Sequence, residues 1–470
     1  MFAIVVILSF FVFAYNSFAT VFKVGPDLQY TKPSEVMPLV NDGDTVLIEA
    51  ALYEGDAGIW RKNNLLIKGT DGVAHLKARD NLPQGKAIWI VQGDNCTIEN
   101  IKFTDAKVPD KNGAGIRFEG TNLTVRHCSF LNNEDGILAG ANPNSTITVE
   151  FSEFGYNGYG NGFSHNIYIG NIKKFVFRFN YTHHAKTGHC IKSRAAENII
   201  LHNRIMDEDD GRASYLINLP NGGRSYIAGN LLMQSPFAQN SKMIDYGSEG
   251  YKHTDNSIFI YNNTLVNKRN PGIYVWVVRG SDTVKILNNI FAGYSANSDN
   301  ALPSFADTSN NYHTSDIPSL AFADENNFDY HLTAESPVID RGTAEISIPG
   351  YENFLQVEYK HPADSSIVTI DNAVDIGAYQ FQKHSTNINE PIKKIKAICS
   401  KGLLIIPDES KNSSSALISI YDLRGVLIKN EIIKAINRSF IINVGQLSNG
   451  IYLYLLFDNG KEIKGVFYKQ

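Results

Sequence analysis

The sequence predicts an all-β chain in which a long coil of short parallel strands precedes a small antiparallel β-sandwich. At 470 residues it exceeds one ordinary compact domain. From about residue 60 a short pattern recurs roughly every 27 residues: a β-branched strand, an Asn or His, then an apolar residue. Amphipathic helices, which a helical solenoid requires, are missing from this pattern. The apolar residues that close successive repeats are Phe103, Phe130, Phe154, Tyr181, Ile205, Leu232, Leu265 and Phe291.

The N-terminal segment, residues 1–20, is an apolar run that ends in small residues and is typical of a secretory signal peptide. A retained membrane anchor is the alternative, but no charged stop-transfer flank follows. Export would permit disulfides, yet four cysteines cannot staple a chain of this length. We therefore expect Cys96, Cys128, Cys190 and Cys399 to be small buried side chains.

The elements then follow in order. A short strand, a brief helix near Pro33 to Val40 and a strand after the turn Asn41 to Asp44 open the coil, and the helix could cap its exposed edge. The coil extends over residues 21–382, a polar linker over 383–396, and the sandwich over 397–470. The recurring Asn residues indicate side-chain amide ladders in a bend. For the same reason we interpret the N-x-S/T triplets at Asn95, Asn122, Asn180 and Asn262 as structural rather than glycosylated.

The repeat resembles the right-handed parallel β-helix of the pectate-lyase-like superfamily over residues 21–382. The segments Phe328 to Gly342 and Asp375 to Gln380 are similar to the closing segments of secreted bacterial proteins of this kind. Because one scaffold hosts many activities, function must be argued from the site.

The last 70 or so residues resemble the C-terminal sorting domain of the Bacteroidetes type IX secretion system. The resemblance is carried by Tyr421 to Gly425, by Leu447 to Tyr452 and by a lysine-containing last strand, whereas the usual Asn-Pro opening strand is absent. It implies a protein secreted or held at the cell surface, with the type IX machinery as a partner. A carbohydrate-binding sandwich is the alternative.

Alternation along the strands separates an inward from an outward row of side chains. We take Ile116, Ile137, Ile167, Ile191, Leu216, Ile244 and Ile273 as inward. The outward row is then Arg117, Leu138, Tyr168, Lys192, Ile217, Asp245 and Tyr274, with Arg194 two residues beyond Lys192.

This outward face fits an acidic polysaccharide, because cations pair with uronate carboxylates and aromatic rings stack on sugars. The predicted reaction is β-elimination: Lys192 removes the proton, Arg194 stabilises the carboxylate, and Tyr168, His165 or His189 is the acid. The predicted substrate-binding residues are His183, His184, Asp245, Tyr274 and Arg117. Alternatively, His165 and His189 are buried stacked rungs, and His183 and His184 are solvated turn residues.

The segment from Lys192 to Asn198 also resembles the stretch that carries the base lysine in the β-helical alginate and chondroitin lyases. Only Lys192, Ser193 and Asn198 match, the last at altered spacing. That family holds calcium with an acidic pair, but residues 183–187 (HHAKT) lack it, so the metal ligands stay unassigned. The family's Arg-His-Gly is replaced by Asn218 to Gly223, which would move the arginine role to Arg194 or Arg224.

Other functions fit parts of the pattern. A glycoside hydrolase could use the run Asp207 to Asp210 with Asp245 or Glu249, and that run could instead bind calcium or be a solvated turn. The histidines could form a transition-metal site across turns. A non-catalytic surface glycan-binding protein is the third candidate. A net charge of -5 gives no reason to bind nucleic acid, and we expect a monomer.

Overall fold

The computed structural model describes residues 19–344 and 346–382, and then 398–400, 402–407, 415–422, 427–436, 439–447, 450–458 and 461–469. It divides into two compact units, residues 1–383 and 384–470. Most of the predicted signal peptide, the whole linker 383–396, and residues 423–425 and 448–449 of the sorting motifs lie outside the described residues. Within the described ranges, no helix is long and apolar enough to cross a membrane.

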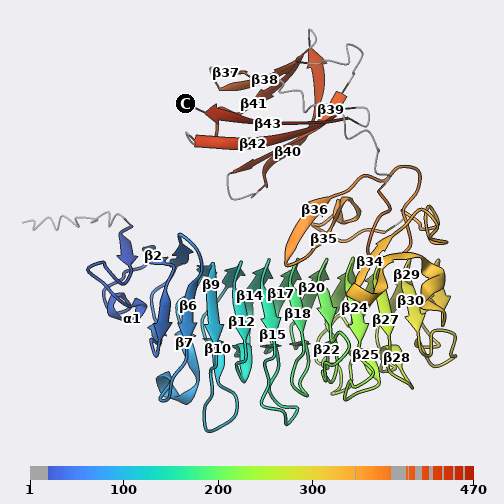
Figure 1. Ribbon diagram of the computed structural model, residues 1–470, viewed down its shortest axis with the longest axis horizontal. Coiled ribbons are helices and arrows are strands. Elements are labelled where there is room, and N and C mark those ends of the chain that lie inside the picture. The colour runs from blue at the N-terminus through green and yellow to red at the C-terminus, as the bar shows by residue number, and fades with distance from the viewer. Residues whose placement is uncertain are drawn as a thin grey trace, which may run out of the picture. The chain divides into compact units, whose positions relative to one another are not determined.

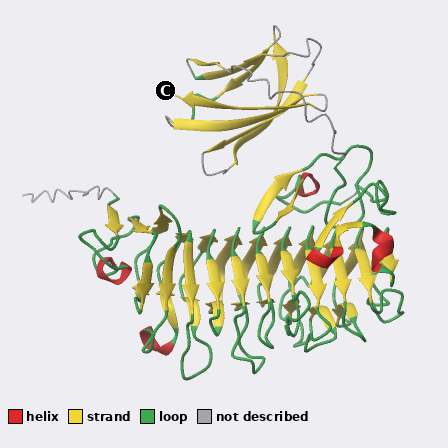
Figure 2. Cartoon of the chain, viewed as in Figure 1, coloured by secondary structure: helices red, strands yellow, loops and turns green. Residues whose placement is uncertain are grey.

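The first unit is a coil of parallel strands in three sheets, and all but the terminal turns contribute one strand to each sheet (Figures 1 and 2). The predicted opening is confirmed: β1 (Val21–Val24), α1 (Pro33–Val36) and β2 (Thr45–Glu49). The twelve-stranded sheet runs β1, β2, β5 (Leu66–Thr70), β8 (Cys96–Glu99), β11 (Leu123–Arg126), β14 (Asn142–Glu150), β17 (Ile172–Arg178), β20 (Glu197–Leu201), β23 (Arg224–Ala228), β26 (Ser257–Tyr261), β29 (Thr283–Leu287) and β31 (Asp307–Ser309).

The other two sheets complete the coil. The nine-stranded sheet contains β4 (Gly58–Trp60), β7 (Ala87–Val91), β10 (Ala114–Phe118), β13 (Asp135–Ala139), β16 (Ile167–Ile169), β19 (Ile191–Ser193), β22 (Ile217–Leu219), β25 (Lys242–Tyr246) and β28 (Ile273–Val277). The eleven-stranded sheet contains β3 (Leu52–Glu54), β6 (Ala74–Lys77), β9 (Ile101–Thr104), β12 (Ser129–Leu131), β15 (Glu153–Gly155), β18 (Tyr181–His183), β21 (Arg204–Met206), β24 (Leu231–Gln234), β27 (Thr264–Asn267), β30 (Ile290–Gly293) and β32 (Tyr312–Thr314).

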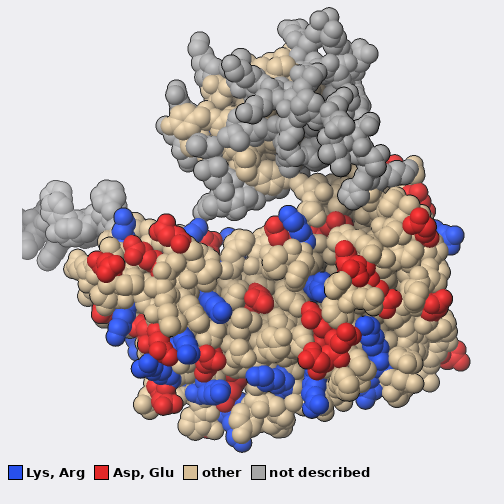
Figure 3. All heavy atoms as spheres, in the orientation of Figure 1, with Lys and Arg blue, Asp and Glu red and all other residues tan. Residues whose placement is uncertain are grey.

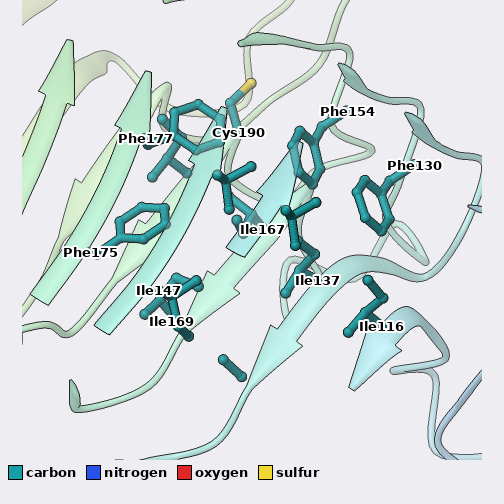
Figure 4. Packing of buried hydrophobic residues seen from close by; sticks show 14 of the residues in the cluster. Ile116, Phe130, Ile137, Ile147, Phe154, Ile167, Ile169, Phe175, Phe177 and Cys190 are labelled. Atoms are coloured by element: carbon teal, nitrogen blue, oxygen red, sulfur yellow. The ribbon is translucent and has the colours of Figure 1, made fainter. Parts of the chain in front are cut away.

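The core is built from stacks of like residues, one from each turn. The rings of Phe103, Phe130 and Phe154 stack with centroids 5.1 and 4.8 Å apart, and Figure 4 shows the last two beside the isoleucines of the nine-stranded sheet. A single turn exposes one face of each stack, so stability comes from neighbouring turns. All four cysteines are free thiols, and Cys96, Cys128 and Cys190 are buried.

A buried asparagine ladder lines the bend between the twelve- and eleven-stranded sheets, as the repeat predicts. Each side-chain amide donates to the side-chain oxygen of the next asparagine at 2.9 to 3.1 Å. The ladder consists of the buried Asn180, Asn203, Asn230, Asn263 and Asn289 and ends at the half-buried Asn311, which donates to the Ile286 carbonyl. Of the N-x-S/T positions, Asn180 and Asn262 are buried, whereas Asn95 and Asn122 pair with each other at the surface.

Two details of the predicted register are wrong. Phe154 is paired with Thr182 rather than with Tyr181, so Thr182 takes the buried position and its hydroxyl accepts a hydrogen bond from Asn166 at 3.0 Å. In the nine-stranded sheet, Ile191 pairs with Ile217, and Ile244 with Val275. The outward row is therefore Arg117, Leu138, Tyr168, Lys192, Asn218, Asp245 and Trp276.

The segment after the coil, residues 317–382, wraps two of the three faces, which the repeat does not predict. It contains the strand pairs β33 (Phe322–Asp324) with β34 (Asp329–Leu332) and β35 (Val357–Lys360) with β36 (Asp364–Ile367). One hydrophobic cluster joins it to the eleven-stranded sheet and another to the twelve-stranded sheet. Neither cluster includes a residue of the nine-stranded sheet.

The second unit is a set of antiparallel strands around its own apolar core, as predicted. Leu404, Ile418, Phe440 and Leu456 are buried in that core. Its strands are β37 (Ile398–Ser400), β38 (Leu403–Pro407), β39 (Ser415–Asp422), β40 (Leu427–Ile436), β41 (Ser439–Asn443), β42 (Gly450–Asp458) and β43 (Lys461–Lys469).

Candidate functional site

The outward row of the nine-stranded sheet brings Tyr168, Lys192 and Arg194 together. Tyr168 on β16 pairs directly with Lys192 on β19. The Arg194 Nε donates to the Tyr168 hydroxyl at 2.9 Å. The Lys192 ammonium lies 5.7 Å from the Tyr168 ring centroid. These three side chains therefore share one external face.

A carboxylate completes this cluster. Glu249 lies in the turn after β25. Its carboxylate forms ion pairs with Lys192 Nζ at 3.4 Å and with Arg194 Nη2 at 2.7 Å. Arg194 also donates to the side-chain oxygen of Asn221. We call Tyr168, Lys192, Arg194 and Glu249 the cationic cluster. Its two cations converge on one carboxylate from the same side of the sheet.

The electrostatics of the cluster are local. Burial lowers the pKa of Lys192 and Arg194 lowers it further, against the opposing effect of Glu249. The pKa of the Glu249 carboxyl is lowered because its bonds to Arg194 and Lys192 outweigh its burial. Charges of both signs are interspersed over the face seen in Figure 3. Since the net charge of the chain is -5, recognition of an anion would depend on particular residues and not on a broad basic field.

His165 and His189 form a stacked pair of rungs beside the cluster. Their rings are 4.6 Å apart at 14°. The His189 backbone N–H donates to His165 Nδ1 at 3.0 Å, and that of Tyr215 donates to His189 Nδ1 at 3.3 Å, which places each ring proton on Nε2. Burial lowers the pKa of His189 to about 3 and that of His165 well below its usual range. His165 stacks on the Tyr168 ring. A neutral, buried histidine pair is better suited to holding Tyr168 in place than to the predicted role of catalytic acid.

His183 and His184 belong to a different cluster, at the end of β18 in the eleven-stranded sheet. They are 4% and 8% exposed, so neither is a solvated turn residue. His183 Nε2 lies 3.4 Å from Glu153, and His184 Nε2 lies 3.0 Å from Asp210. The prediction that they bind substrate beside Lys192 is not supported by this placement.

The remaining predicted binding residues differ in their access to solvent. Tyr274 is fully buried, and its hydroxyl donates to the Ala292 carbonyl at 2.7 Å; its place in the outward row was wrong, because Trp276 occupies it. Asp245 is in the row but is also fully buried. Arg117 is partly exposed, contacts Glu119 at 3.5 Å and lies three strands from Lys192. Sequence reasoning missed Trp276 and Asn221.

The acidic run Asp207 to Asp210 does not act as a unit. Asp207 is buried, whereas the other three carboxylates pair with different residues: Glu208 with Tyr181 and Arg204, Asp209 with Lys268, and Asp210 with His184. Calcium prefers several carboxylate and carbonyl oxygens directed at one point, which this arrangement does not provide. Among the described residues, no group of three or more His, Cys, Asp or Glu could hold a metal ion.

Asp207 should make stability depend on pH. Burial raises the pKa of this carboxyl from 3.8 to about 7, and its Oδ2 has no hydrogen-bond partner. Between these two pKa values the folded state keeps a proton on Asp207 that the unfolded chain releases. The contribution of Asp207 to the free energy of unfolding is therefore fully present below pH 3.8 and is lost as the pH rises through about 7. We expect Asp207→Asn to become more stable than the native protein by up to about 4 kcal/mol at pH 8, with little difference at pH 4. Urea unfolding at both pH values measures this, and an equal difference at the two would contradict it.

The comparisons with known proteins agree with these two units. Residues 63–160 match the model of the right handed beta helix region, and residues 400–467 match that of the secretion system C-terminal sorting domain. The chain is a right-handed parallel β-helix protein with a C-terminal sorting domain. The β-helix protein is accordingly secreted or held at the cell surface, and type IX secretion handles it.

Solved structures also match the β-helix protein. The crystal structure of pectate lyase Pel9A covers 78% of this chain and 97% of its own, with 16% identity and a TM-score of 0.53. At that identity the likeness concerns the fold alone. The match to the crystal structure of the Dettilon tailspike protein (gp208) covers 57% of this chain and 62% of that one, with 14% identity. Its TM-score of 0.29 is too low to indicate a shared fold. No curated protein matches the sequence significantly.

Proposed function

We propose that the β-helix protein is a polysaccharide lyase that cleaves a uronate-containing glycan by β-elimination. The supporting observation is that Lys192 and Arg194 hold one carboxylate, that of Glu249, at 3.4 and 2.7 Å beside the Tyr168 hydroxyl. Glu249 is nearly half exposed, so a ligand from solvent could displace it. The position it occupies suits the carboxylate of a uronate residue.

Each residue of the cationic cluster has a role in this proposal. The uronate carboxylate displaces Glu249 and pairs with Arg194, which stabilises the charge that develops as the α-proton leaves. Lys192, in its neutral form, takes that proton. Tyr168 donates a proton to the departing glycosidic oxygen. The lowered pKa of Lys192 favours its role as base.

The test is incubation of the mature protein with polygalacturonate, alginate and glycosaminoglycans while absorbance is followed near ~230 nm, where the unsaturated uronate product of elimination absorbs. We expect a rise with at least one of them. New reducing ends without that absorbance would instead indicate hydrolysis and would contradict elimination.

A glycan-binding protein without turnover is the second candidate. The Glu249 ion pair stabilises the protonated form of Lys192, and a protonated lysine binds anions but cannot act as a base. Retention on an immobilised polyuronate, with no product of either kind, would favour this candidate.

Replacement Glu249→Gln separates the two roles of this carboxylate. It removes the negative charge that raises the pKa of Lys192, so neutral Lys192 appears at lower pH. We expect the rising limb of kcat/KM against pH to move to lower pH and KM to fall several-fold, because the uronate no longer competes with Glu249. Kinetics over a pH series measures both. An unchanged profile would show that Glu249 does not control Lys192, and Glu119→Gln, which contacts Arg117 and Lys86 instead, is the control.

A further inference from the structure

We propose that Trp276 and Lys242 form a second subsite for an acidic sugar, distal to the cationic cluster. This inference rests on the proposed function, in that it assigns a further binding position to the same glycan. Trp276 is 42% exposed, whereas the chain's other two tryptophans, Trp60 and Trp89, are fully buried. An exposed indole at the end of a binding face is a platform for the apolar face of a sugar ring.

Lys242 gives this platform a charge preference. Its Nζ lies 4.4 Å from the centroid of the Trp276 ring and 6.0 Å from that of Tyr215. Its side chain retains 21% exposure, so the ammonium can still reach an anion from solvent. A sugar that stacks on the indole and carries a carboxylate would satisfy both groups, whereas a neutral sugar would use only the ring.

Asp245 holds the lysine in place from beneath. This carboxylate is fully buried and lies 3.4 Å from Lys242 Nζ. It also accepts hydrogen bonds from Asn218 at 2.8 Å and from the Ser248 hydroxyl at 2.5 Å. Because Asp245 is fully buried, it can orient Lys242 but cannot contact a ligand from solvent. It is therefore a positioning residue and not the substrate contact that the sequence predicted.

The register sets the distance between the two sites. Lys192 pairs with Asn218, Asn218 with Asp245, and Asp245 with Trp276. Three steps between strands amount to about 14 Å. A ligand that touches both sites must therefore run across the strands, along the axis of the coil, and must contain several sugar residues. Short oligosaccharides should not gain from Trp276.

Tryptophan fluorescence tests this subsite without relying on catalysis. The Lys192→Met variant is titrated with oligogalacturonides and oligoalginates of increasing length, and with cello-oligosaccharides as neutral ligands. Because Trp276 is the exposed tryptophan, we expect a shift of emission that appears only above a threshold length and is strongest with the acidic ligands. Trp276→Leu should abolish the shift, and affinity measured by calorimetry should fall about tenfold for long acidic ligands but not for short ones.

Two further variants fix the interpretation. Lys242→Met should weaken the binding of long acidic ligands and leave the binding of neutral ligands unchanged. Tyr468→Leu removes an exposed aromatic residue of the sorting domain and should change neither affinity. Elimination of long substrates with no fluorescence response would overturn the subsite and leave the lyase proposal standing. A fluorescence response without elimination would support the subsite and remove the lyase proposal. No response to any acidic ligand would overturn the subsite.

Discussion

Replacement of Lys192 by methionine should lower kcat on the cleaved polyuronate by about 10²- to 10⁴-fold. Methionine keeps the length of the side chain and much of its apolar stem but cannot accept a proton. Arg194, Tyr168 and Glu249 keep their mutual contacts, so substrate should still bind and KM should change little. Initial rates near ~230 nm with a polyuronate measure the effect.

The matched control is Lys173→Met, which removes an exposed lysine of β17 in the twelve-stranded sheet. It changes the net charge equally and should leave kcat and KM unaltered. If Lys192→Met retains more than about a tenth of the native kcat, a general-base role for Lys192 is wrong, and Tyr168→Phe would then identify whether the hydroxyl acts instead.

The coil could be predicted because its signals are local and repeated. Short strands, Gly- and Asn-rich turns and a period near 27 residues each follow from the packing of one turn on the next. Register was harder to predict. Leu216 and Ile217 are adjacent apolar residues, and period-two alternation does not say which of them points inward. At the last strand the error is a shift of two residues, because Ile244 pairs with Val275 rather than with Ile273. Alternation cannot detect such a shift, since Tyr274 and Trp276 have the same parity along the strand.

Contacts between distant residues limited the prediction of the site. The pairing of Tyr168 with Lys192 follows from a constant repeat, but Glu249 reaches Lys192 from 57 residues later, out of a turn of its own. His183 and His184 lie close to Lys192 in the sequence, yet the chain passes from the eleven-stranded to the nine-stranded sheet between them. Residues 317–382 cover the apolar outer faces of two sheets. The sequence did not predict this cover, because apolar outward residues are not distinguishable in a repeat that is itself largely apolar.

Substitution Asn230→Ala should destabilise the β-helix by about 3 to 5 kcal/mol. Asn230 is fully buried. Its Nδ2 donates to the Ile200 carbonyl and to Asn263 Oδ1, each at 2.9 Å, and its Oδ1 accepts from the Asn203 backbone and side-chain N–H groups. Alanine removes the side-chain acceptor of the Asn203 backbone N–H, and an unpaired buried group of this kind costs about 1 to 3 kcal/mol. It also removes one hydrogen bond each from Asn203 Nδ2, which keeps the Phe177 and Leu201 carbonyls, and from Asn263 Oδ1, which keeps the Asn230 backbone N–H. Each of these lost bonds costs about 1 kcal/mol.

Asn171→Ala provides the comparison, because Asn171 is exposed at the turn before β17 and should change stability by less than about 0.5 kcal/mol. Urea midpoints of the two variants measure the difference. Equal midpoints would mean that the asparagine ladder does not contribute to the stability of the bend. A large gap would mean that the amides hold successive turns in register, and hence that they fix the spacing at which Tyr168, Lys192 and Trp276 are presented along one face.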